Sequence, residues 1–510
     1  MKRFFKLLSS KLAFAILLFL VQIAILVVLI LSLLNFQNTV SVYVQIGFQA
    51  LSIIVCIYII NRDDKSDYKL AWIVPILLFP LFGGFLYLTL GRQRVNSKMQ
   101  NRINKINEQT EEALRLSVEH ADSRSLSPTN AKISEYILNQ ENFPLYDKTQ
   151  TTYYPLGEYF MSAMLEEMEK AEKYIFIEFF IIAKGVFLER ILRLLRSKRE
   201  QGVEIKIIYD DVGSLGKITA DIIKKIRSYG IEIHAFNKIH ASVNTNNRDH
   251  RKIVVIDGVT AFTGGINVSD EYINVTHPYG HWKDTGMKFT GNAAWSFAVM
   301  FLRFWQMLSS EEADTHKYIP EKQNEQETDG YVQPLCSGPD NKNRLIKNAF
   351  LQIINGAKEY VYINTPYLIL DDETTTALCL AAKSGVDVQI TMPHIPDKKL
   401  IFIMSRSFYI PLLKAGVKIY EYTPGFIHAK SIVSDDSTAY IGSCNFDYRS
   451  FFLHYEVGAI LYETQSIEDM KKDYLQTVQL CHAVKTEEAT DVRLFTKLGR
   501  AVLRLFAPLL

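Results

Sequence analysis

An internal duplication limits the folds open to this chain more than any other feature of its sequence. Three pairs of segments match in the same order: Ala171–Glu178 with Ala357–Asn364, Gly202–Tyr209 with Gly385–Met392, and Gly230–Ile233 with Gly416–Ile419. Each segment carries the apolar residues of a buried strand, and helical stretches such as Leu188–Arg199 separate them. Alternating helices and strands predict an α/β fold with largely parallel strands covered by helices. The duplication predicts two such units related by pseudo-two-fold symmetry.

Both halves end in the same polar signature, HRKIVVID in the first and HAKSIVSD in the second. A Gly-x-x-Asn element follows each signature, and the histidine precedes the asparagine by 17 residues in both copies. The shared residues are His250, Lys252, Asp257 and Asn267 in the first copy, and His428, Lys430, Asp435 and Asn445 in the second. One such match could be a coincidence on a surface strand. Two matches at equivalent places in a duplicated unit indicate a catalytic site.

A histidine and a lysine two residues apart on a strand project to the same face, an arrangement that suits chemistry on a phosphodiester. The ammonium group balances charge on the non-bridging oxygens, while the imidazole attacks phosphorus or moves a proton. Displacing a poor alkoxide leaving group needs a nucleophile on one side of phosphorus and an acid on the other. Each copy supplies one imidazole, so both copies are expected to meet in one active site.

These residues resemble the phospholipase D superfamily, whose mark is a duplicated HxKxxxxD motif. The resemblance implies an α/β fold of two phospholipase D-like domains and a two-step reaction without a metal or other cofactor. One histidine becomes a phosphohistidine, while the other protonates the leaving alcohol and then deprotonates the incoming one. Family habit makes His250 the nucleophile and His428 the acid and base, although the pseudo-symmetry leaves the reverse order open. The phosphate-holding positions of the family correspond to Lys252, Lys430, Asn267 and Asn445.

Two further carboxylates, Asp284 and Glu456, each follow a motif histidine at the place where the family has a residue that orients the imidazole. The motif aspartates, Asp257 and Asp435, are expected to brace a loop rather than touch the reacting atoms. Ser443 is expected to contact the substrate. The first copy has glycine at the equivalent position 265, so one hydroxyl contact is expected to be missing there.

Within the superfamily, the chain is most similar to the bacterial cardiolipin synthases, and this resemblance covers nearly its whole length. It rests on the N-terminal apolar segments and on these stretches: Ala71–Gly91, Ile177–Phe180, Tyr209–Gly213, Asn246–Lys252, Thr365–Tyr367 and Leu505–Leu510. The resemblance implies transfer of a phosphatidyl group between two phosphatidylglycerol molecules, giving cardiolipin and glycerol. The implied partners are these lipids and the bilayer that holds them, and a homo-oligomer is left open.

Other functions share part of this pattern. A hydrolytic phospholipase D, or a transferase that uses another alcohol, would carry the same catalytic residues. A nuclease of the superfamily or a catalytically silent lipid-binding scaffold are further alternatives. The 57 basic and 55 acidic residues argue against a nucleic-acid partner. The five cysteines form no CxxC pair, which argues against a zinc site and a disulfide framework.

The N-terminal region, residues 1–93, is rich in apolar sequence. Segments 12–34 and 40–60 are long enough to span a bilayer, and a third, 70–90, either spans or re-enters because prolines and glycines interrupt it. Basic residues near the spans place the N-terminus in the cytoplasm. The catalytic part is expected there as well if segment 70–90 re-enters, and outside if that segment spans. The prediction is a multi-pass protein of a bacterial cell membrane.

The remaining sequence divides into a charged connector at 94–145, the first repeat at 146–310, a polar linker at 311–330, the second repeat at 331–485 and a tail at 486–510. In the tail, basic residues recur beside an apolar stripe. This pattern is typical of a helix that lies on anionic lipid, and a terminal helix packed on the protein core is the alternative.

Overall fold

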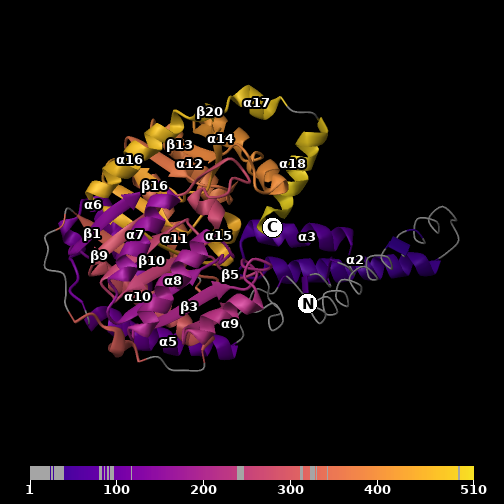
Figure 1. The fold of residues 1–510 in the computed structure, drawn as a ribbon. Helices are drawn as coiled ribbons and strands as arrows, with labels where there is room; N and C mark the ends of the chain where they lie inside the picture. The colour runs from indigo at the N-terminus through magenta and orange to yellow at the C-terminus, as the bar shows by residue number, and fades with distance from the viewer. Residues whose placement is uncertain are drawn as a thin grey trace. The chain divides into compact units, whose positions relative to one another are not determined.

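The computed structural model (Figure 1) forms two compact units. Unit 1 comprises Met1–Arg94, Ile239–Asn244 and Phe495–Leu510, and unit 2 comprises Val95–Lys238 and Thr245–Leu494. The structure describes residues 39–79, 97–116, 118–237, 246–309, 314–321, 328, 330–341, 343–491 and 494–509, with the isolated positions 23, 24, 27, 83, 84, 87, 88 and 91. All the motif residues lie in unit 2.

Unit 2 contains two large sheets that repeat one strand order. The first sheet runs β1 (Thr149–Tyr154), β9 (Gly286–Gly291), β7 (Thr260–Gly264), β6 (Lys252–Ile256), β2 (Tyr174–Phe179), β3 (Glu204–Asp210) and β4 (Glu232–Phe236). The second sheet runs β10 (Tyr331–Ser337), β19 (His454–Tyr462), β17 (Thr438–Gly442), β16 (Ser431–Ser434), β11 (Tyr360–Asn364), β13 (Asp387–Pro393), β14 (Lys418–Tyr422) and β20 (Cys481–Ala483). The orders match strand for strand, with β20 as an additional edge. The predicted duplication of an α/β unit is therefore confirmed.

Both sheets are mixed, which corrects the prediction of largely parallel strands. Along the strand orders given above, only β2, β3 and β4 pair in parallel in the first sheet, and β11, β13 and β14 in the second. The motif strands β6 and β16 join these groups in antiparallel fashion, and the following strands are antiparallel as well. Short hairpin turns join β6 to β7 and β16 to β17, where parallel pairing would require a long crossover connection.

Helices cover both faces of each sheet, so the strands are buried on both sides. Helices α7 and α8 contact one side of the first sheet, while α10 packs on β2, β6 and β7. In the second repeat α11 and α12 take the places of α7 and α8, and α16 runs along the outside of the sheet (Figure 1). The helices of unit 2 are α5 (Ser97–Leu116), α6 (Pro128–Glu141), α7 (Gly157–Glu169), α8 (Val186–Glu200), α9 (Ala220–Ser228), α10 (Ala293–Leu308), α11 (Leu345–Gly356), α12 (Asp372–Lys383), α13 (Lys399–Ser405), α14 (Tyr409–Ala415), α15 (Tyr448–Phe452), α16 (Gln465–Val478) and α17 (Thr486–Thr490).

Two short parallel pairings join the repeats reciprocally. Strand β5 (Arg248–Asp249) of the first repeat pairs with the start of β19 in the second, and β15 (Gly425–Ile427) of the second pairs with β8 (His281–Lys283) of the first. Strand β5 ends immediately before His250, and β15 ends immediately before His428. Each repeat therefore provides a short strand that pairs with the other repeat directly before its own motif.

The described part of unit 1 consists of α2 (Thr39–Ile60), α3 (Ser66–Leu78) and the tail helix α18 (Leu494–Phe506), with a short 3-10 turn, η4 (Ala507–Leu509), packed on α3. The chain reverses after α3. The Tyr68 hydroxyl donates to the Gly91 carbonyl at 3.1 Å, and the rings of Trp72 and Tyr87 lie 5.5 Å apart. Segment 70–90 therefore turns back on itself within the residues the structure describes.

Among the described residues, no helix is both long and apolar enough to cross a membrane. The expected transmembrane helices and multi-pass topology are therefore not confirmed. The candidate span 12–34 lies outside the described residues except for positions 23, 24 and 27, and half of the linker 311–330 lies outside them as well.

Candidate active site

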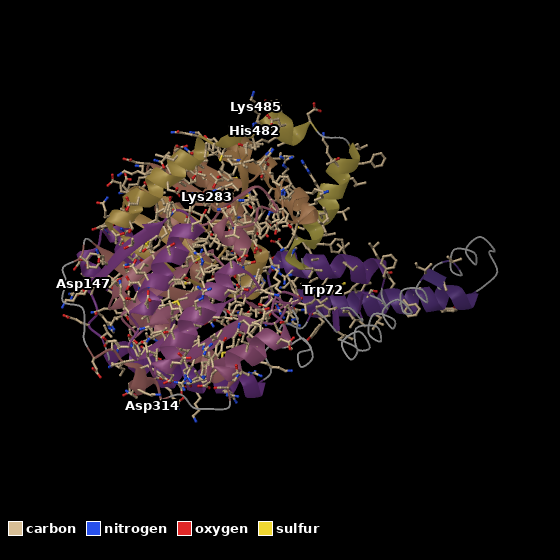
Figure 2. The ribbon with its side chains drawn as sticks, in the orientation of Figure 1. Trp72, Asp147, Lys283, Asp314, His482 and Lys485 are labelled. Atoms are coloured by element: carbon tan, nitrogen blue, oxygen red, sulfur yellow. The ribbon has the colours of Figure 1, made fainter. Side chains whose placement is uncertain are left out.

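Each motif histidine follows a short strand that pairs with the other repeat and precedes the motif strand of its own sheet: His250 lies between β5 and β6, and His428 between β15 and β16. The backbone N–H of His250 donates to the Tyr455 carbonyl at 3.0 Å, and that of His428 donates to the Lys283 carbonyl at 2.7 Å. Lys283, labelled in Figure 2, also holds Asp473 through its ammonium group at 2.6 Å. The histidines thus occupy breaks between strands, whereas Lys252 already belongs to β6. The prediction that each histidine and its lysine lie two residues apart on one continuous strand is therefore wrong, because neither histidine belongs to its motif strand.

The orienting carboxylates are exchanged between the repeats. Glu456, from the second repeat, places both carboxylate oxygens 3.0 Å from Nδ1 of His250 in the first. Asp284, from the first repeat, places Oδ2 2.6 Å from Nδ1 of His428 in the second. Both carboxylates are fully buried. Because Nδ1 of each ring is engaged, Nε2 is the nitrogen left for chemistry.

Different groups hold the two orienting carboxylates, and this difference explains why the first repeat has Gly265 where the second has Ser443. The Ser443 hydroxyl donates to Oε2 of Glu456 at 2.5 Å. A side chain at position 265 would bring its Cβ within 2.1 Å of Oδ1 of Asp284, so only glycine fits there. Instead, Oδ1 of Asp284 accepts the backbone N–H of Thr285 at 2.8 Å. The structure therefore gives Ser443 a role in holding a carboxylate, and the expected substrate contact stays a prediction.

The motif lysines are buried, and their ammonium groups contact the motif histidines. Lys252 donates to the His250 carbonyl at 2.5 Å, and Lys430 lies 2.8 Å from Nδ1 of His428. Burial lowers the pKa of Lys252 to about 8 and that of Lys430 to about 7. Burial also raises the pKa of Asp284 to about 7, against the opposing charge of Lys430. Two such cations that lack full charge balance are suited to receive a phosphate anion.

The two imidazoles are each 6% exposed and are held in their neutral form. Burial, followed by the charge of Lys252, lowers the pKa of His250 well below its ordinary value. Burial, followed by the charge of Lys430, does the same for His428. The charge of His250 itself contributes to lowering the pKa of His428, as expected of two rings that share one site. A neutral imidazole has the lone pair that a nucleophile needs.

The rings beside the two histidines form a set that the sequence analysis did not assign. Phe180 and His454 lie next to His250, with ring centroids 5.0 and 5.4 Å away. Next to His428 the ring centroids of Tyr272, Trp282 and Phe426 lie at 5.3, 5.4 and 5.9 Å. His454 and Trp282 could have been found from sequence, because each stands two residues before an orienting carboxylate.

The motif aspartates brace loops, as expected. The carboxylate of Asp257 accepts the backbone N–H groups of residues 172, 173 and 174 at 2.7–2.8 Å. Asp435 accepts those of residues 358, 359 and 360 at 2.7, 3.0 and 2.9 Å. Both aspartates have positive φ, 53° and 50°. They tie the turn after the motif strand to the start of the neighbouring strand and do not contact the imidazoles.

The side-chain amides of Asn267 and Asn445 differ in how many of their atoms form hydrogen bonds within the protein. Asn267 accepts the Ile181 N–H at 3.0 Å and donates to the Tyr272 hydroxyl at 2.9 Å. Asn445 donates to Asp447 at 2.9 Å, while its Oδ1 is buried without a hydrogen-bond partner. Their expected contact with phosphate stays a prediction.

Within the residues that the structure describes, His250, His454 and Glu456 form one group whose ligand atoms lie within 4.8 Å of one another, a spacing that could hold a metal ion. The group includes the motif histidine and its orienting carboxylate. Its third member, His454, also accepts a hydrogen bond from Arg449 at 3.2 Å.

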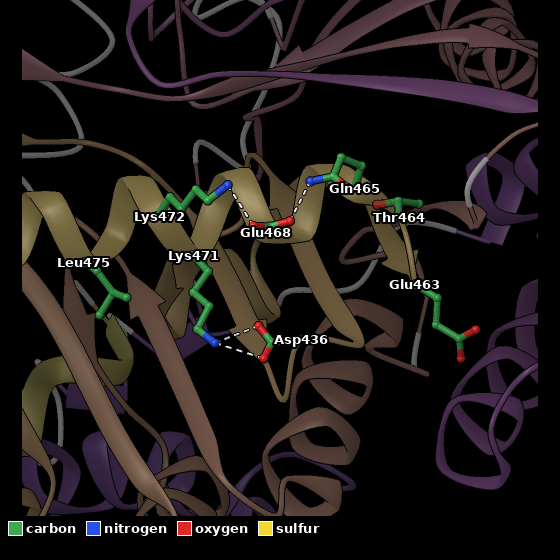
Figure 3. Close-up of a pocket in the computed structure, with 8 residues that line it drawn as sticks. All are labelled: Asp436, Glu463, Thr464, Gln465, Glu468, Lys471, Lys472 and Leu475. Carbon is green, nitrogen blue, oxygen red and sulfur yellow. Dashed lines mark hydrogen bonds and ion pairs between the residues drawn. The ribbon is translucent and has the colours of Figure 1, made fainter.

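A surface hollow of about 580 Å³ lies elsewhere (Figure 3). It is lined by Asp436 and by the start of α16, at the end of β16 opposite His428. Figure 3 shows two ion pairs among its charged groups: Lys471 with Asp436 at 2.8 Å, and Lys472 with Glu468 at 2.7 Å. Neither motif histidine nor motif lysine lines this hollow, so it is not the site that the motifs predict.

Comparison with known proteins agrees with the duplicated site. Residues 164–278 and 350–477 match the family model described as cardiolipin synthase, PLD-like domain, and residues 50–92 match the model described as phospholipase D-nuclease N-terminal. The two matches to the first model contain the motif histidines of both repeats.

Relatives of the whole chain show the same relationship. The chain is 36% identical to an uncharacterised protein of Streptococcus mutans, over 89% of this chain and 99% of the relative. It is 33% identical to the cardiolipin synthase of Geobacillus kaustophilus, over 96% and 99%. The crystal structure of a phosphatidylserine synthase of Haemophilus influenzae superposes with a TM-score of 0.57 at 15% identity, covering 74% of this chain and 98% of that chain, which supports the fold.

Proposed function

Because this chain belongs to the cardiolipin synthase family of the phospholipase D superfamily, we propose that it transfers a phosphatidyl group from one phosphatidylglycerol to another. The products are cardiolipin and glycerol. The observation that carries the proposal is the pair of buried, neutral imidazoles, each held through Nδ1 by a carboxylate of the other repeat.

The first step is attack by Nε2 of His250 on the phosphorus of the donor lipid. The N–P bond forms as the bond from phosphorus to the glycerol oxygen breaks, and His428 supplies the proton that the leaving alkoxide needs. Glu456 stabilises the positive charge that develops on the attacking ring. The entering phosphodiester anion raises the pKa of His428 toward the range in which it can carry that proton.

The second step reverses the first with a different alcohol. The terminal hydroxyl of a second phosphatidylglycerol gives its proton to His428 as its oxygen attacks the phosphohistidine. The P–O bond of cardiolipin forms, the N–P bond breaks, and His250 returns to its neutral state. Lys252 and Lys430 hold the non-bridging oxygens through both steps and offset their charge.

Transfer rather than hydrolysis requires that a lipid alcohol outcompete water, and membrane association provides this advantage by raising the local concentration of acceptor. Two features of unit 1 support association. Helix α18 exposes Leu494, Phe495 and Leu498, which are 77%, 86% and 62% accessible. The same helix carries Lys497 and Arg504, so apolar and basic groups occur together, as in helices that bind anionic lipid.

Product analysis tests the proposed function. The purified protein is incubated with phosphatidylglycerol as the only phospholipid, and lipids and free glycerol are quantified. We expect equal amounts of cardiolipin and glycerol, and no product from a His250→Ala variant. Phosphatidic acid as the main product would indicate a hydrolase instead. A product that forms only after addition of another alcohol, such as serine, would indicate a different transferase.

A further inference from the structure

The inference concerns His454, a residue outside both motifs that lies directly beside the nucleophile's carboxylate. Its Nδ1 is 3.6 Å from Oε1 of Glu456, just beyond hydrogen-bond length. On the opposite edge of the ring, Nε2 accepts the Nε–H of Arg449 at 3.2 Å. The His454 ring therefore lies between the guanidinium of Arg449 and the buried carboxylate of Glu456.

Arg449 determines which ring nitrogen of His454 carries the proton. A guanidinium group only donates hydrogen bonds, so Nε2 of His454 must offer a lone pair. Burial lowers the pKa of His454 to about 3, so the ring is neutral at ordinary pH and has a single N–H. That N–H is on Nδ1 and faces Glu456.

This protonation state makes His454 a hydrogen-bond donor rather than a metal ligand. A metal bound at Nδ1 would need the lone pair there and would move the proton to Nε2, against the donating Nε–H of Arg449. In the buried site Oε2 of Glu456 accepts the Ser443 hydroxyl, while the Nδ1–H of His454 faces Oε1 at 3.6 Å, a distance at which it acts through its dipole rather than through a hydrogen bond. A buried carboxylate requires such donors to keep its charge.

The other half of the site has an equivalent residue. Trp282 stands two residues before Asp284, as His454 stands two before Glu456. The Trp282 ring lies 5.4 Å from His428 at an interplanar angle of 43°, and the His454 ring lies 5.4 Å from His250 at 42°. The indole N–H beside Asp284 helps to lower that carboxyl's pKa against the larger effect of burial. The same place in both halves thus holds a ring N–H next to the carboxylate.

We propose that His454 is a positioning residue for the nucleophile: its Nδ1–H, whose place on the ring Arg449 determines, faces Oε1 of Glu456 across 3.6 Å and stabilises that carboxylate in the orientation that engages Nδ1 of His250. The carboxylate then keeps the proton of His250 on Nδ1 and leaves Nε2 free to attack phosphorus. This inference rests on the proposed function, since it assigns His250 the attacking role.

A matched pair of substitutions tests the role of the N–H. His454→Leu removes the donor, whereas His454→Asn keeps an amide N–H at a similar place. We expect the leucine variant to lose roughly ten- to hundredfold in kcat, as for other partners of an orienting group, with KM for phosphatidylglycerol changed by less than about threefold. The asparagine variant should recover most of that loss. Equal activity of the two variants, or a rise in KM with kcat unchanged, would overturn the proposal.

The protonation state is tested on the full chain without turnover. Nitrogen-15 spectra of histidine-labelled protein in detergent, with His454→Asn used to assign the signals, should show His454 as the neutral Nδ1–H form. Arg449→Met should remove this preference. A ring that carries its proton on Nε2 would refute the inference, as would zinc that binds the wild-type protein through His454. Since the spectra need no lipid product, failure of cardiolipin formation would refute the proposed function while leaving this measurement to decide the inference.

Discussion

The exchange of carboxylates between the repeats makes a prediction that a linear view of the motifs does not. Glu456→Gln should slow the attack of His250, although Glu456 belongs to the other repeat. Asp284→Asn should instead affect His428. In Glu456→Gln the amide keeps the shape of the side chain and loses its charge, so the comparison isolates the electrostatic contribution.

The magnitude follows from the contacts. Both carboxylate oxygens of Glu456 lie 3.0 Å from Nδ1 of His250, and hydrogen bonds to a charged group contribute about 1.5–3 kcal/mol. At about 1.36 kcal/mol for each factor of ten in rate, this loss corresponds to roughly 10- to 150-fold. A glutamine that turns its N–H toward Nδ1 would also move the imidazole proton to Nε2 and remove the attacking lone pair. The corresponding change in a Ser-His-Asp triad costs about 10⁴-fold, which sets the upper bound.

Rapid-quench measurement of the phosphoenzyme separates the two roles. With short-chain phosphatidylglycerol in excess over enzyme, Glu456→Gln should slow the appearance of the covalent adduct by the stated factor. Asp284→Asn should slow both formation and breakdown of the adduct, because His428 protonates the leaving glycerol and deprotonates the second alcohol, and the adduct that forms should persist. Intact-mass spectrometry identifies the adduct, and thermal unfolding checks that both variants fold. If Asp284→Asn abolished adduct formation while Glu456→Gln left its rate unchanged, the assignment of the carboxylates and of the nucleophile would be refuted.

Three further predictions follow from the described contacts. Lysines with pKa lowered to about 7 (Lys430) and 8 (Lys252) lose charge as pH rises through these values, so kcat/KM should fall on the alkaline side from about pH 7 to 8. Lys430→Arg, which removes the lower of the two pKa values, should move the start of this fall toward pH 8; a flat profile up to pH 9 would contradict it. Asp435→Ala removes the acceptor of three backbone N–H groups and should lower the free energy of unfolding by about 2–4 kcal/mol, measured by urea denaturation with Asp435→Asn as the milder control; no change in midpoint would contradict it. Replacing Phe495 and Leu498 together by alanine should weaken binding to phosphatidylglycerol vesicles by at least about tenfold, measured by co-sedimentation, and unchanged binding would contradict a role for α18.

The motifs and the duplication could be predicted because both are local patterns. A buried strand leaves a run of apolar residues, a helix leaves a longer periodicity, and two copies in the same order leave matched intervals. His250 and His428 were therefore found with their lysines, and the loop-bracing role of Asp257 followed from its place at the end of a motif strand. The mixed character of the sheets was missed because strand direction depends on the connections.

Sequence also located Asp284 and Glu456 but did not reveal which histidine each one serves. That choice depends on β5 pairing with β19 and β15 with β8, contacts between residues far apart in the chain that no local pattern records. The role of Ser443 is decided in the same way, because the position of Glu456 across the repeat interface determines what its hydroxyl can reach.

By itself, then, the sequence determined the kind of chemistry: two imidazoles and two ammonium groups, duplicated in an α/β unit. Only the tertiary structure decided how those groups are paired, how deeply they are buried and hence how far their pKa values move. The physical reason is that residue type sets what a group can do, whereas the energy of a charge or a proton depends on its neighbours in space.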